Sequence, residues 1–586
     1  MIGLIAVTAS GRVAARRLAS VLPDARVYTE PAGQALGRAF AECDQVVCFL
    51  AVGATVRLIA PLLTGKASDP GVICVDEACA FAVPIAGAHA GGANRLARDV
   101  AEILGATAVI TTASDAAGTI ALDEFGADLG FRVEEGSDLA EVGGAVLSGE
   151  RVTLSMDQTW PVPALPPNVI RTERPEPGVP AIVVTDRAAG AGPLTTGPLT
   201  TGPSAVAAGP PRVIYRPPSL VLGAGASRGV SAAEMGALMD GALADAGLAP
   251  AAVVQVATVD LKKDEQGLAE AARERGWRLV TYPAAELAAI PVPNPSEAVR
   301  AATGTPSVAE AAALRAAGDG AVLAAGKRKS GKATVAIARR RPRGRLALVG
   351  TGPGARDLMT PRAVAELRRA SVVVGLRQYL DRVRDLLRPG TRVLATGLGA
   401  EEERAAKAVS QARAGHAVAL IGSGDAGVYA MASPALEIAD GSIEVSGVPG
   451  VTAALAAAAV LGAPLGHDHA CISLSDLHTP WDAIERRISA AADADLVVCF
   501  YNPRSRARAG HLAKALAVLA SRRPPRTPVG MVTDASCPGQ RAVLSTLGAF
   551  DATQAGMRTL VIVGSSQTRV VAGRMVTPRG YRWRGA

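Results

Sequence analysis

Short apolar runs followed by glycine-rich turns recur along most of this chain. Val418–Ile421 is an apolar run of the length that favours a buried parallel strand. A turn with three glycines follows it, with Asp425 at its tip and Tyr429 on the expected next helix. Ile443–Val445 begins a second unit of this kind, in which Thr452 is placed to cap an alanine-rich helix. Two such turns at the carboxyl ends of parallel strands predict a crevice for a small molecule.

The beginning of the chain alternates strand-like and helix-like segments in the same way. Strands are expected at Ile2–Val7, Gln45–Leu50, Val72–Val75 and Ala108–Thr111, and helices at Arg12–Ser20 and Gly92–Leu104. From about residue 131 to residue 218 the pattern loosens. Residues 131–170 there suggest a small domain with short strands, and the tandem repeat GPLTTGPLTTGPSA predicts a linker that buries no core. Strand and helix patterns resume at residue 219.

These patterns predict an α/β, multidomain chain. At 586 residues it is too long for one ordinary domain. The expected segments are 1–130, an α/β domain; 131–218, a middle region with the linker; 219–338, a further domain; 339–345, a basic linker; and 346–465 and 466–586, two subdomains.

Composition narrows the class of protein. Apolar residues make up 49% and aromatic residues only 3%, so the cores are built from Ala, Val and Leu. No apolar run is long enough to span a bilayer, and MIGLIAVTAS has no basic region before its apolar stretch, so it suggests a first strand rather than a signal peptide. Seven cysteines without a CxxC pair argue against a zinc site and a disulfide framework. We therefore expect a cytoplasmic protein with no membrane partner and no metal site.

The net charge of +8 is concentrated in clusters such as Lys327–Lys332 and Arg339–Arg345. Nucleic-acid binding would need aromatic side chains among the basic ones, and aromatics are scarce here. An anionic substrate or a soluble linker explains the clusters better. Gly326–Lys332 also spells GxxxxGK, but Ala333 stands where a phosphate-binding loop needs Ser or Thr, and a strand rather than a helix is expected next. We predict a β-hairpin there and no ATP.

The C-terminal 240 residues or so carry five ordered motifs of a known family. SGDAGVY with VPGVTAA, GTGPGARDLMTPRA, SLSDLHTPW, FYNPRSR and VIVGSSQTRVVAGRMVTPRGY resemble the signatures of the tetrapyrrole (precorrin) methylases, in particular the ring-contracting precorrin-3B C-17-methyltransferases. The resemblance implies a two-domain, class III S-adenosylmethionine-dependent methyltransferase fold. It also implies that a tetrapyrrole is the substrate, that the methylase half forms a homodimer, and that handover to other corrin-pathway enzymes occurs.

The resemblance assigns the cofactor, S-adenosylmethionine, to a fold between the two subdomains. The residues that it implies around the cofactor are Pro353, Gly424, Asp425, Tyr429, Thr452, Ala453, Tyr501, Asn502 and Thr559. A dinucleotide site is the alternative, since Gly350–Ala355 also satisfies GxGxxA. That alternative lacks the acidic residue expected at the end of the second strand, because Ser371–Val374 is followed by GLRQ. Thr360 and Pro361 instead mark a later helix start.

Ring contraction requires proton transfers, and LGHDHACISLSDLHTPW supplies the groups for them. His467, Asp468 and Asp476 are the catalytic candidates, and His467 and Asp476 flank an expected strand at 470–474, so that both could face one cleft. A metal site is the alternative, although the spacing matches no metal motif. Arg504 and Arg569 are candidates for binding substrate carboxylates, with a solvated surface arginine as the alternative for each.

The N-terminal part resembles another family of the same pathway. The motif GxHxGGAN at residues 87–94 and the sequence on both sides of it resemble the cobalt-precorrin-5A hydrolases of the CbiG type. His89 is the catalytic candidate, and Asn94 and Arg95 are candidates for a substrate carboxylate, because a Gly-Gly helix start favours anions. Asp115 is a further candidate whose other role would be a helix cap. Residues 219–338 resemble the C-terminal domain of that family; Lys262 and Asp264, after a strand end there, fit either ligand contact or helix-start solvation.

The sequence therefore predicts a bifunctional enzyme of cobalamin biosynthesis. The C-terminal half would methylate C-17 and contract the ring of precorrin-3B or its cobalt form. The N-terminal half would open the lactone of cobalt-precorrin-5A and release an aldehyde. The alternative for the N-terminal half is a non-catalytic module that binds or hands over a tetrapyrrole.

Overall fold

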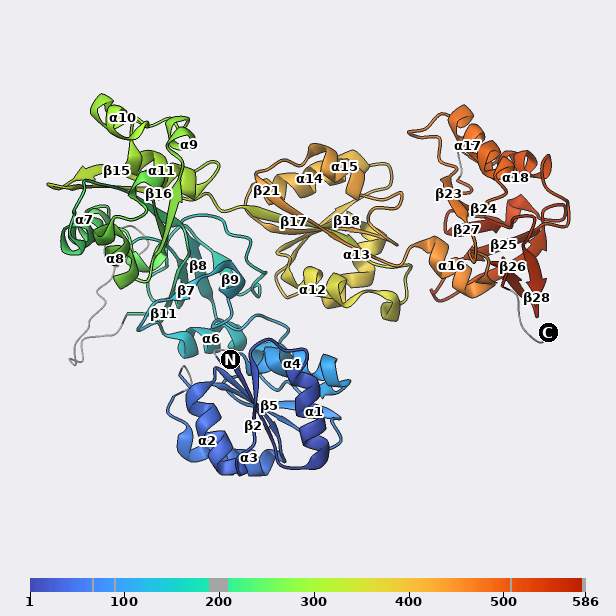
Figure 1. Ribbon diagram of the computed structural model, residues 1–586. Helices are drawn as coiled ribbons and strands as arrows, with labels where there is room; N and C mark the ends of the chain where they lie inside the picture. Colours follow the sequence, from blue (N-terminus) through green and yellow to red (C-terminus); the bar gives the residue numbers. More distant parts are fainter. Residues whose placement is uncertain (66–67, 89–90, 189–208, 506–507, 582–586) are drawn as a thin grey trace. The chain divides into compact units, whose positions relative to one another are not determined.

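The computed structural model describes residues 1–65, 68–88, 91–188, 209–505 and 508–581 (Figure 1). It comprises two compact units, Met1–Pro342 with Arg388–Gly390, and Arg343–Leu387 with Thr391–Ala586. The boundary between Pro342 and Arg343 falls inside the basic segment 339–345. The GPLTTGPLTTGPSA repeat and His89 lie outside the described residues.

A six-stranded sheet of order β2-β1-β3-β4-β5-β6 opens the first unit. β1 to β4 are parallel, whereas β5 runs antiparallel to β4 and β6 runs parallel to β5. Its helices α1 and α4 pack on one face and α2 and α3 on the other (Figure 1). The bounds are β1 (Ile2–Ala6), α1 (Ala9–Ala19), β2 (Ala25–Tyr28), α2 (Ala32–Glu42), β3 (Gln45–Phe49), α3 (Val52–Ile59), η1 (Ala60–Leu62), β4 (Gly71–Val75), β5 (Phe81–Ala86), α4 (Ala93–Leu104) and β6 (Thr107–Ala108).

The expected strands and helices of this sheet are present, except that the strand predicted at 108–111 is reduced to β6. The elements β2, α2, α3 and β5 were not anticipated. Because β5 reverses direction, the loop before α4 lies at the edge of the sheet where β1, β3 and β4 begin.

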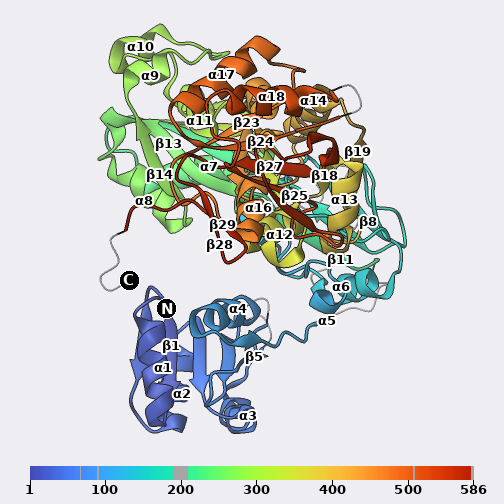
Figure 2. The same cartoon turned by 90° about the vertical axis from the view of Figure 1, so that its right-hand side faces the viewer.

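The middle region is more ordered than the sequence pattern suggested. Its strands form a sheet of order β7-β11-β10-β8-β9. Phe125, Phe131, Trp160 and Tyr215 pack against one another beside this sheet, with ring centroids 5.2–6.4 Å apart. The bounds are α5 (Ala113–Ala116), η2 (Ala127–Leu129), β7 (Arg132–Val133), α6 (Leu139–Ser148), β8 (Val152–Met156), β9 (Val169–Arg171), β10 (Ala181–Val184) and β11 (Arg212–Arg216), with α5 and α6 marked in Figure 2.

The third sheet of the first unit has the order β14-β13-β12-β16-β15. Its helices α7 and α8 cover one face, and α9 and α11 cover the other. β15 and β16 form an antiparallel hairpin, which confirms that the GxxxxGK segment is not a phosphate-binding loop opening a helix. The bounds are β12 (Leu220–Ala226), α7 (Ala232–Asp245), η3 (Pro250–Ala252), β13 (Val253–Val259), η4 (Asp260–Lys262), α8 (Gln266–Glu274), β14 (Arg278–Tyr282), α9 (Ala284–Ala288), α10 (Glu297–Thr303), α11 (Val308–Ala317), β15 (Val322–Lys329) and β16 (Ala333–Arg339).

The basic segment is a shorter connection than predicted, because its ends belong to strands. Arg339 closes β16, and its guanidinium binds the buried carboxylate of Asp186 through two hydrogen bonds of 2.7 and 2.8 Å. Arg345 lies in β17 and forms an ion pair with Glu366, with both side chains about 15% exposed. Only residues 340–343 remain outside both strands.

The second unit begins with a fully parallel sheet of order β19-β18-β20-β17-β21. The helices α12 and α13 cover one face and α14 and α15 the other (Figure 1). Thr360 caps α12 through its hydroxyl and Pro361 is its first residue, as predicted. The bounds are β17 (Gly344–Gly350), η5 (Arg356–Leu358), α12 (Pro361–Arg369), β18 (Val372–Leu376), α13 (Arg377–Val383), η6 (Arg384–Leu386), β19 (Arg392–Thr396), α14 (Glu401–Arg413), β20 (Ala417–Gly422), α15 (Ala432–Ile438) and β21 (Ile443–Val448).

A mixed sheet of order β23-β24-β27-β25-β26 completes the second unit, beside a small sheet of order β22-β29-β28. The helices α17 and α18 pack on one face of the mixed sheet and α16 on the other. The bounds are α16 (Ala453–Leu461), β22 (Gly462–Ala463), β23 (His469–Ser473), α17 (Trp481–Asp493), β24 (Val497–Tyr501), α18 (His511–Ala520), β25 (Pro528–Thr533), β26 (Arg541–Thr546), η7 (Ala552–Gln554), β27 (Thr559–Val563), β28 (Arg569–Val571) and β29 (Arg574–Val576).

The unit boundary yields a first prediction. A fragment of residues 343–586 retains every strand of the second unit, so it should be soluble and unfold cooperatively in a circular-dichroism thermal melt. A fragment starting at Thr360 lacks β17, which lies between β20 and β21, and should not fold. If the 343–586 fragment is insoluble while the full chain is soluble, the two units share a core and the boundary is wrong.

Candidate functional site

The loops after β17, β20 and β21 contact one another through their backbones. Gly352 and Gly424 exchange two hydrogen bonds, in which each amide donates to the other carbonyl at 3.0 and 2.8 Å. A Cβ atom on Gly450 would lie 2.1 Å from the carbonyl oxygen of Gly424, and one on Gly350 would lie 2.7 Å from it. Only glycine fits at these close approaches, so the glycines recognised in the sequence bring three loops together.

The carboxylate of Asp425 joins two of these loops. It accepts hydrogen bonds from the amide of Gly427, at 2.8 Å, and from the amide of Gly450, at 3.0 Å. Asp425 does not line the cavity beside the loops. Its position is therefore that of a residue that orders the cavity wall rather than one that contacts a ligand.

A cavity of about 220 Å³ lies at these loops, between the parallel sheet and the mixed sheet of the second unit. Eight of the nine residues predicted from the sequence to surround a cofactor line it: Pro353, Gly424, Tyr429, Thr452, Ala453, Tyr501, Asn502 and Thr559. Val532, Met557 and Leu560 add apolar surface. The cavity thus combines aromatic rings, apolar side chains and a few polar groups, as small-molecule sites do.

Tyr501 connects the two sheets at this cavity. Its hydroxyl lies 2.7 Å from the hydroxyl of Thr452 and accepts a hydrogen bond of 3.0 Å from the amide of Ala454. Thr452 is at the N-cap of α16 but makes no side-chain cap, so the prediction that it caps this helix through its hydroxyl is wrong. The phenol of Tyr501 satisfies a first-turn amide instead. Burial raises the pKa of Tyr501, which keeps this phenol protonated.

Tyr429 is on a loop and not on a helix, because α15 begins only at Ala432. Its φ of 51° is unusual for a tyrosine. Its hydroxyl donates to the carbonyl of Cys471 in β23 at 2.6 Å, and its ring centroid is 5.0 Å from that of Tyr501. The strained loop therefore positions Tyr429 to link the glycine turn to the mixed sheet.

Two arginines at the cavity were not recognised from the sequence. Arg382, on α13, and Arg558 line it, and with Cys537 they also line an adjoining cavity of about 250 Å³. Arg558 lies 3.1 Å from the carboxylate of Asp534, whereas the guanidinium of Arg382 has no hydrogen bond or ion pair within the described part of the chain. In the sequence, both look like ordinary surface arginines.

The structure does not bring His467 and Asp476 into one cleft. They lie beyond opposite ends of β23, whose five residues span about 16 Å. The side chains of His467 and Asp468 are exposed, and the amide of Asp468 donates to the His467 ring at 2.8 Å. Asp476 follows the carboxyl end of β23 and lies 3.5 Å from His511, which the sequence did not single out. None of these residues lines the cavity.

The predicted substrate arginines of this unit also lie away from the cavity. Arg504 donates to the carbonyl of Thr553, and Arg569 lies on β28 with an exposed side chain. Neither has a position that distinguishes it from a surface arginine.

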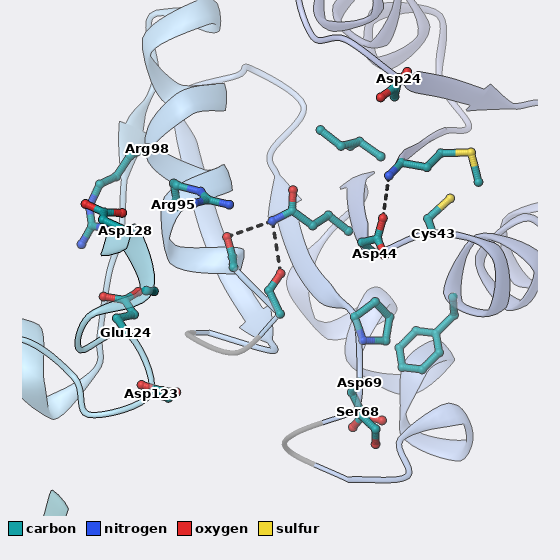
Figure 3. A pocket seen from close by; sticks show the side chains of 18 of the residues that line it. Asp24, Cys43, Asp44, Ser68, Asp69, Arg95, Arg98, Asp123, Glu124 and Asp128 are labelled. Carbon is teal, nitrogen blue, oxygen red and sulfur yellow. Dashed lines mark hydrogen bonds and ion pairs between the residues drawn. The ribbon is translucent and has the colours of Figure 1, made fainter. Parts of the chain in front are cut away.

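A larger cavity, of about 1030 Å³, lies at the first sheet, where the chain enters β1, β3 and β4 (Figure 3). Arg95 and Arg98 of α4 line it, together with acidic residues such as Asp44, Asp69 and Asp128. Gln45 donates from its side chain to the carbonyls of Gly91 and Gly92, at 3.1 and 3.2 Å, and so holds the start of α4 against the sheet.

Asn94 differs from its neighbour Arg95, because it is buried and does not line this cavity. Its amide lies 3.3 Å from both the Thr112 hydroxyl and the Asp115 carboxylate. Asp115 also pairs with Arg98 at 2.6 Å. In this arrangement Asn94 and Asp115 connect α4 to the segment after β6, and Arg95 is the predicted substrate residue that reaches the cavity.

Two further properties concern the described residues only. No group of three or more His, Cys, Asp or Glu side chains among them is placed to hold a metal ion. None of their helices is both long enough and apolar enough to cross a membrane.

Three family models match this chain. Tetrapyrrole (Corrin/Porphyrin) Methylases match residues 345–551, the Cobalamin synthesis G N-terminal family matches residues 34–115, and the Cobalamin synthesis G C-terminus family matches residues 220–338. The first contains the residues that line the cavity of the second unit, except those at 557–560. The other two span β3 to β6 of the first sheet and the strands of the third sheet.

Relatives of known description match the second unit. A protein of Salmonella typhimurium, described as "Probable cobalt-factor III C(17)-methyltransferase", is 48% identical over 239 residues, which are 40% of this chain and 99% of that protein. A "Precorrin-3B C(17)-methyltransferase" of a Sinorhizobium species is 42% identical over 249 residues, 41% of this chain and 97% of that protein. The crystal structure of the methyltransferase CobJ is 36% identical and covers 40% of this chain and all of that one, with a TM-score of 0.38.

The loop contacts yield a second prediction, about stability. Asp425→Ala removes the acceptor for two amides and should lower the unfolding free energy of the 343–586 fragment by about 1–2 kcal/mol in urea. Asp425→Asn keeps one acceptor oxygen and should cost less. Asp381→Ala, which removes an exposed partner of Arg384, is the control and should change stability by less than about 0.5 kcal/mol. Equal losses for Asp425→Ala and the control would contradict the proposed link between loops.

Proposed function

We propose that this chain, which belongs to the tetrapyrrole methylase family, methylates C-17 of precorrin-3B or cobalt-factor III in cobalamin biosynthesis, with S-adenosylmethionine as methyl donor. The observation that carries the proposal is the cavity between the two sheets of the second unit. It is formed by three interlocked glycine loops and by residues of both sheets. This half of the chain is also the part that its methyltransferase relatives match over almost their entire length.

The residues at the cavity fit this cofactor. Tyr501, Val532 and Leu560 offer aromatic and apolar surface for an adenine ring, and Thr452, Asn502 and the backbone of Gly424 offer polar contacts for the ribose and the amino-acid part. When bound, S-adenosylmethionine supplies an electrophilic methyl group. Pro353, Tyr429, Ala453 and Thr559 complete the enclosure, while Asp425 orders the loops from outside it.

The protein's main task in this reaction is to position the two reactants. Holding the carbon nucleophile in line with a methyl group supplies most of the rate, because little acid–base help is needed. We assign the adjoining cavity to a carboxylate-bearing edge of the tetrapyrrole. Arg382 and Arg558 line both cavities and would bind its acetate or propionate groups, which fixes the ring relative to the cofactor.

Ring contraction requires a proton donor or acceptor as well. Of the candidates from the sequence, Asp476 lies at the carboxyl end of β23, the same edge as Tyr501 and Asn502, and it faces His511. We therefore assign proton transfer to the Asp476–His511 pair. His467 and Asp468 lie beyond the other end of β23, and we assign them no step.

For the N-terminal half we infer the cobalt-precorrin-5A hydrolase activity that the Cobalamin synthesis G families and the GxHxGGAN motif support. His89 would exchange the proton, and Arg95, at the start of α4, would bind a peripheral carboxylate of the substrate. A cytoplasmic location, a homodimer formed through the methylase half, and handover of the product to other corrin-pathway enzymes complete the proposal.

The third prediction separates substrate binding from cofactor binding. Arg382→Ala should raise the KM for the tetrapyrrole by roughly ten-fold, because one charge-assisted contact is lost. The affinity for S-adenosylmethionine, measured by calorimetry, should stay within about two-fold. Arg384→Ala, on an exposed neighbour that pairs with Asp381, should change neither quantity. If calorimetry detects binding of NAD but no binding of S-adenosylmethionine, the proposed cofactor is wrong. If the KM of Arg382→Ala for the tetrapyrrole is unchanged, Arg382 does not bind the substrate.

The fourth prediction concerns the hydrolase half. Loss of a general acid or base costs about 10² to 10⁴ in rate, so His89→Gln should abolish most aldehyde release from cobalt-precorrin-5A. C-17 methylation by the same preparation should be unchanged. Aldehyde release at the wild-type rate would instead favour a binding or handover module. A parallel loss of methylation would mean that the substitution damaged the fold.

A further inference from the structure

We propose that a basic cavity in the third sheet of the first unit is a further tetrapyrrole site, separate from the two substrate sites proposed above, which binds the carboxylate side chains of the macrocycle. The cavity measures about 590 Å³ and lies at the carboxyl ends of β12 and β13, the edge where open α/β sheets bind ligands. The identity of the ligand rests on the function proposed above. The anionic character of the ligand rests on the cavity alone.

Five basic side chains and no acidic one line this cavity. They come from the loop after β12, from η4 and from the β15–β16 hairpin: Arg228, Lys262, Lys327, Lys329 and Lys332. The side-chain ammonium groups of Lys327 and Lys332 donate to backbone carbonyls, of Asn294 at 3.0 Å and of Gly229 at 3.4 Å. Arg228, Lys262 and Lys329 have no hydrogen bond or ion pair within the described part of the chain.

The acidic side chains nearby already have other partners. Glu310 is fully buried and accepts from the side chain of Asn294 at 2.7 Å. Glu234 accepts from the hydroxyl of Ser330 at 2.6 Å and from the amide of Lys332 at 2.7 Å. Asp245 pairs with Arg328. Within the described part of the chain none of the five cations forms an ion pair with a carboxylate, and a bound anion would supply that partner.

Backbone geometry adds to the positive potential. Residues 307–309, at the start of the ten-residue helix α11, line the cavity. A Cβ atom on Gly223 of β12 would lie 1.8 Å from the carbonyl oxygen of Ala309, so this glycine lets the first turn of α11 pack directly against β12. The amides of that turn have no partner within the helix, and helix starts favour anions.

The proposed enzymatic function assigns no role to the basic segment GKRKSGK in the β15–β16 hairpin. The geometry of the hairpin explains the spacing of its lysines. Successive side chains of a strand point to opposite faces, so Lys327 and Lys329 share one face and Arg328 has the other. Lys327 and Lys329 line the cavity, whereas Arg328 is turned to Asp245. The spacing of the lysines therefore places charge on the cavity side of the hairpin.

The arrangement suits several separated carboxylates better than one compact phosphate. The cations come from different elements around the cavity, and between them lie apolar groups of Ala226, Val299 and Val308. An apolar surface with cations around it matches a macrocycle whose flat face is apolar and whose rim carries carboxylates. A phosphate site would need its donors to converge on one point.

The test uses the full chain and uroporphyrin, a porphyrin whose side chains all end in carboxylates, followed by fluorescence titration. Wild type should bind uroporphyrin at the third-sheet cavity in addition to the sites proposed for methylation and for hydrolysis. The double variant Lys262→Ala/Lys329→Ala should weaken the third-sheet site alone by roughly ten-fold or more, because two cations that face the ligand are lost. The matched control is Lys263→Ala/Arg273→Ala, which removes the same charge from exposed positions outside the cavity and should change none of the sites.

Two outcomes would overturn the inference. One is equal behaviour of the double variant and its control. The other is displacement of uroporphyrin from this site by ATP, which would indicate a nucleotide site. Uroporphyrin octamethyl ester, which is uncharged, should not bind there. C-17 methylation by the double variant should equal that of wild type. Wild type could also fail to methylate C-17 while the double variant still loses a uroporphyrin site. That result would refute the proposed function and would support the assignment of the cavity.

Discussion

Direct backbone contact between glycine loops is the constraint on which the catalytic half depends. Gly350 and Gly450 approach the carbonyl of Gly424 so closely that a Cβ atom on either of them would push the loops apart. That approach places the carboxyl ends of three parallel strands around one point and positions Asp425 to bind two of the loops together. The second sheet then closes the cavity through two hydroxyl contacts: Tyr429 of the loop after β20 donates to Cys471 in β23, and Tyr501 of β24 bonds to Thr452 after β21. The cofactor assignment follows from this enclosure.

Electrostatics distinguishes the three cavities. Arg382 and Arg558 stand beside the cavity of the methylase unit, the cavity of the first sheet mixes arginines with many carboxylates, and the cavity of the third sheet is basic only. A substrate with many carboxylates experiences these environments differently, because an unpaired cation attracts it and a neighbouring carboxylate repels it. The proposed function, two steps of one pathway on one chain, requires both binding and release. The different charges of the cavities offer a physical basis for binding the substrate at one cavity and releasing it at another.

The sequence revealed the features that depend on backbone geometry. The glycines, the cap at Thr360 and the hairpin in place of a phosphate-binding loop were predictable, because each requires particular residues at fixed spacing. Arg382 and Arg558 were not, because an arginine beside a cavity has the same local sequence as one in solvent. Short strands were expected within residues 131–170, but β10 and β11 were missed, since both are short and the repeat separates them in the sequence. Tyr429 was placed on a helix because nothing in the sequence marks its positive φ.

The central claim is that this chain transfers a methyl group to C-17. The most direct test is anaerobic incubation of the full chain with precorrin-3B or cobalt-factor III and S-adenosylmethionine that carries an isotopically labelled methyl group, followed by mass spectrometry and nuclear magnetic resonance of the product. The account predicts one labelled methyl group, located on C-17 of a ring-contracted macrocycle. Label on another carbon, or no label in the macrocycle while S-adenosylmethionine is bound, would contradict it.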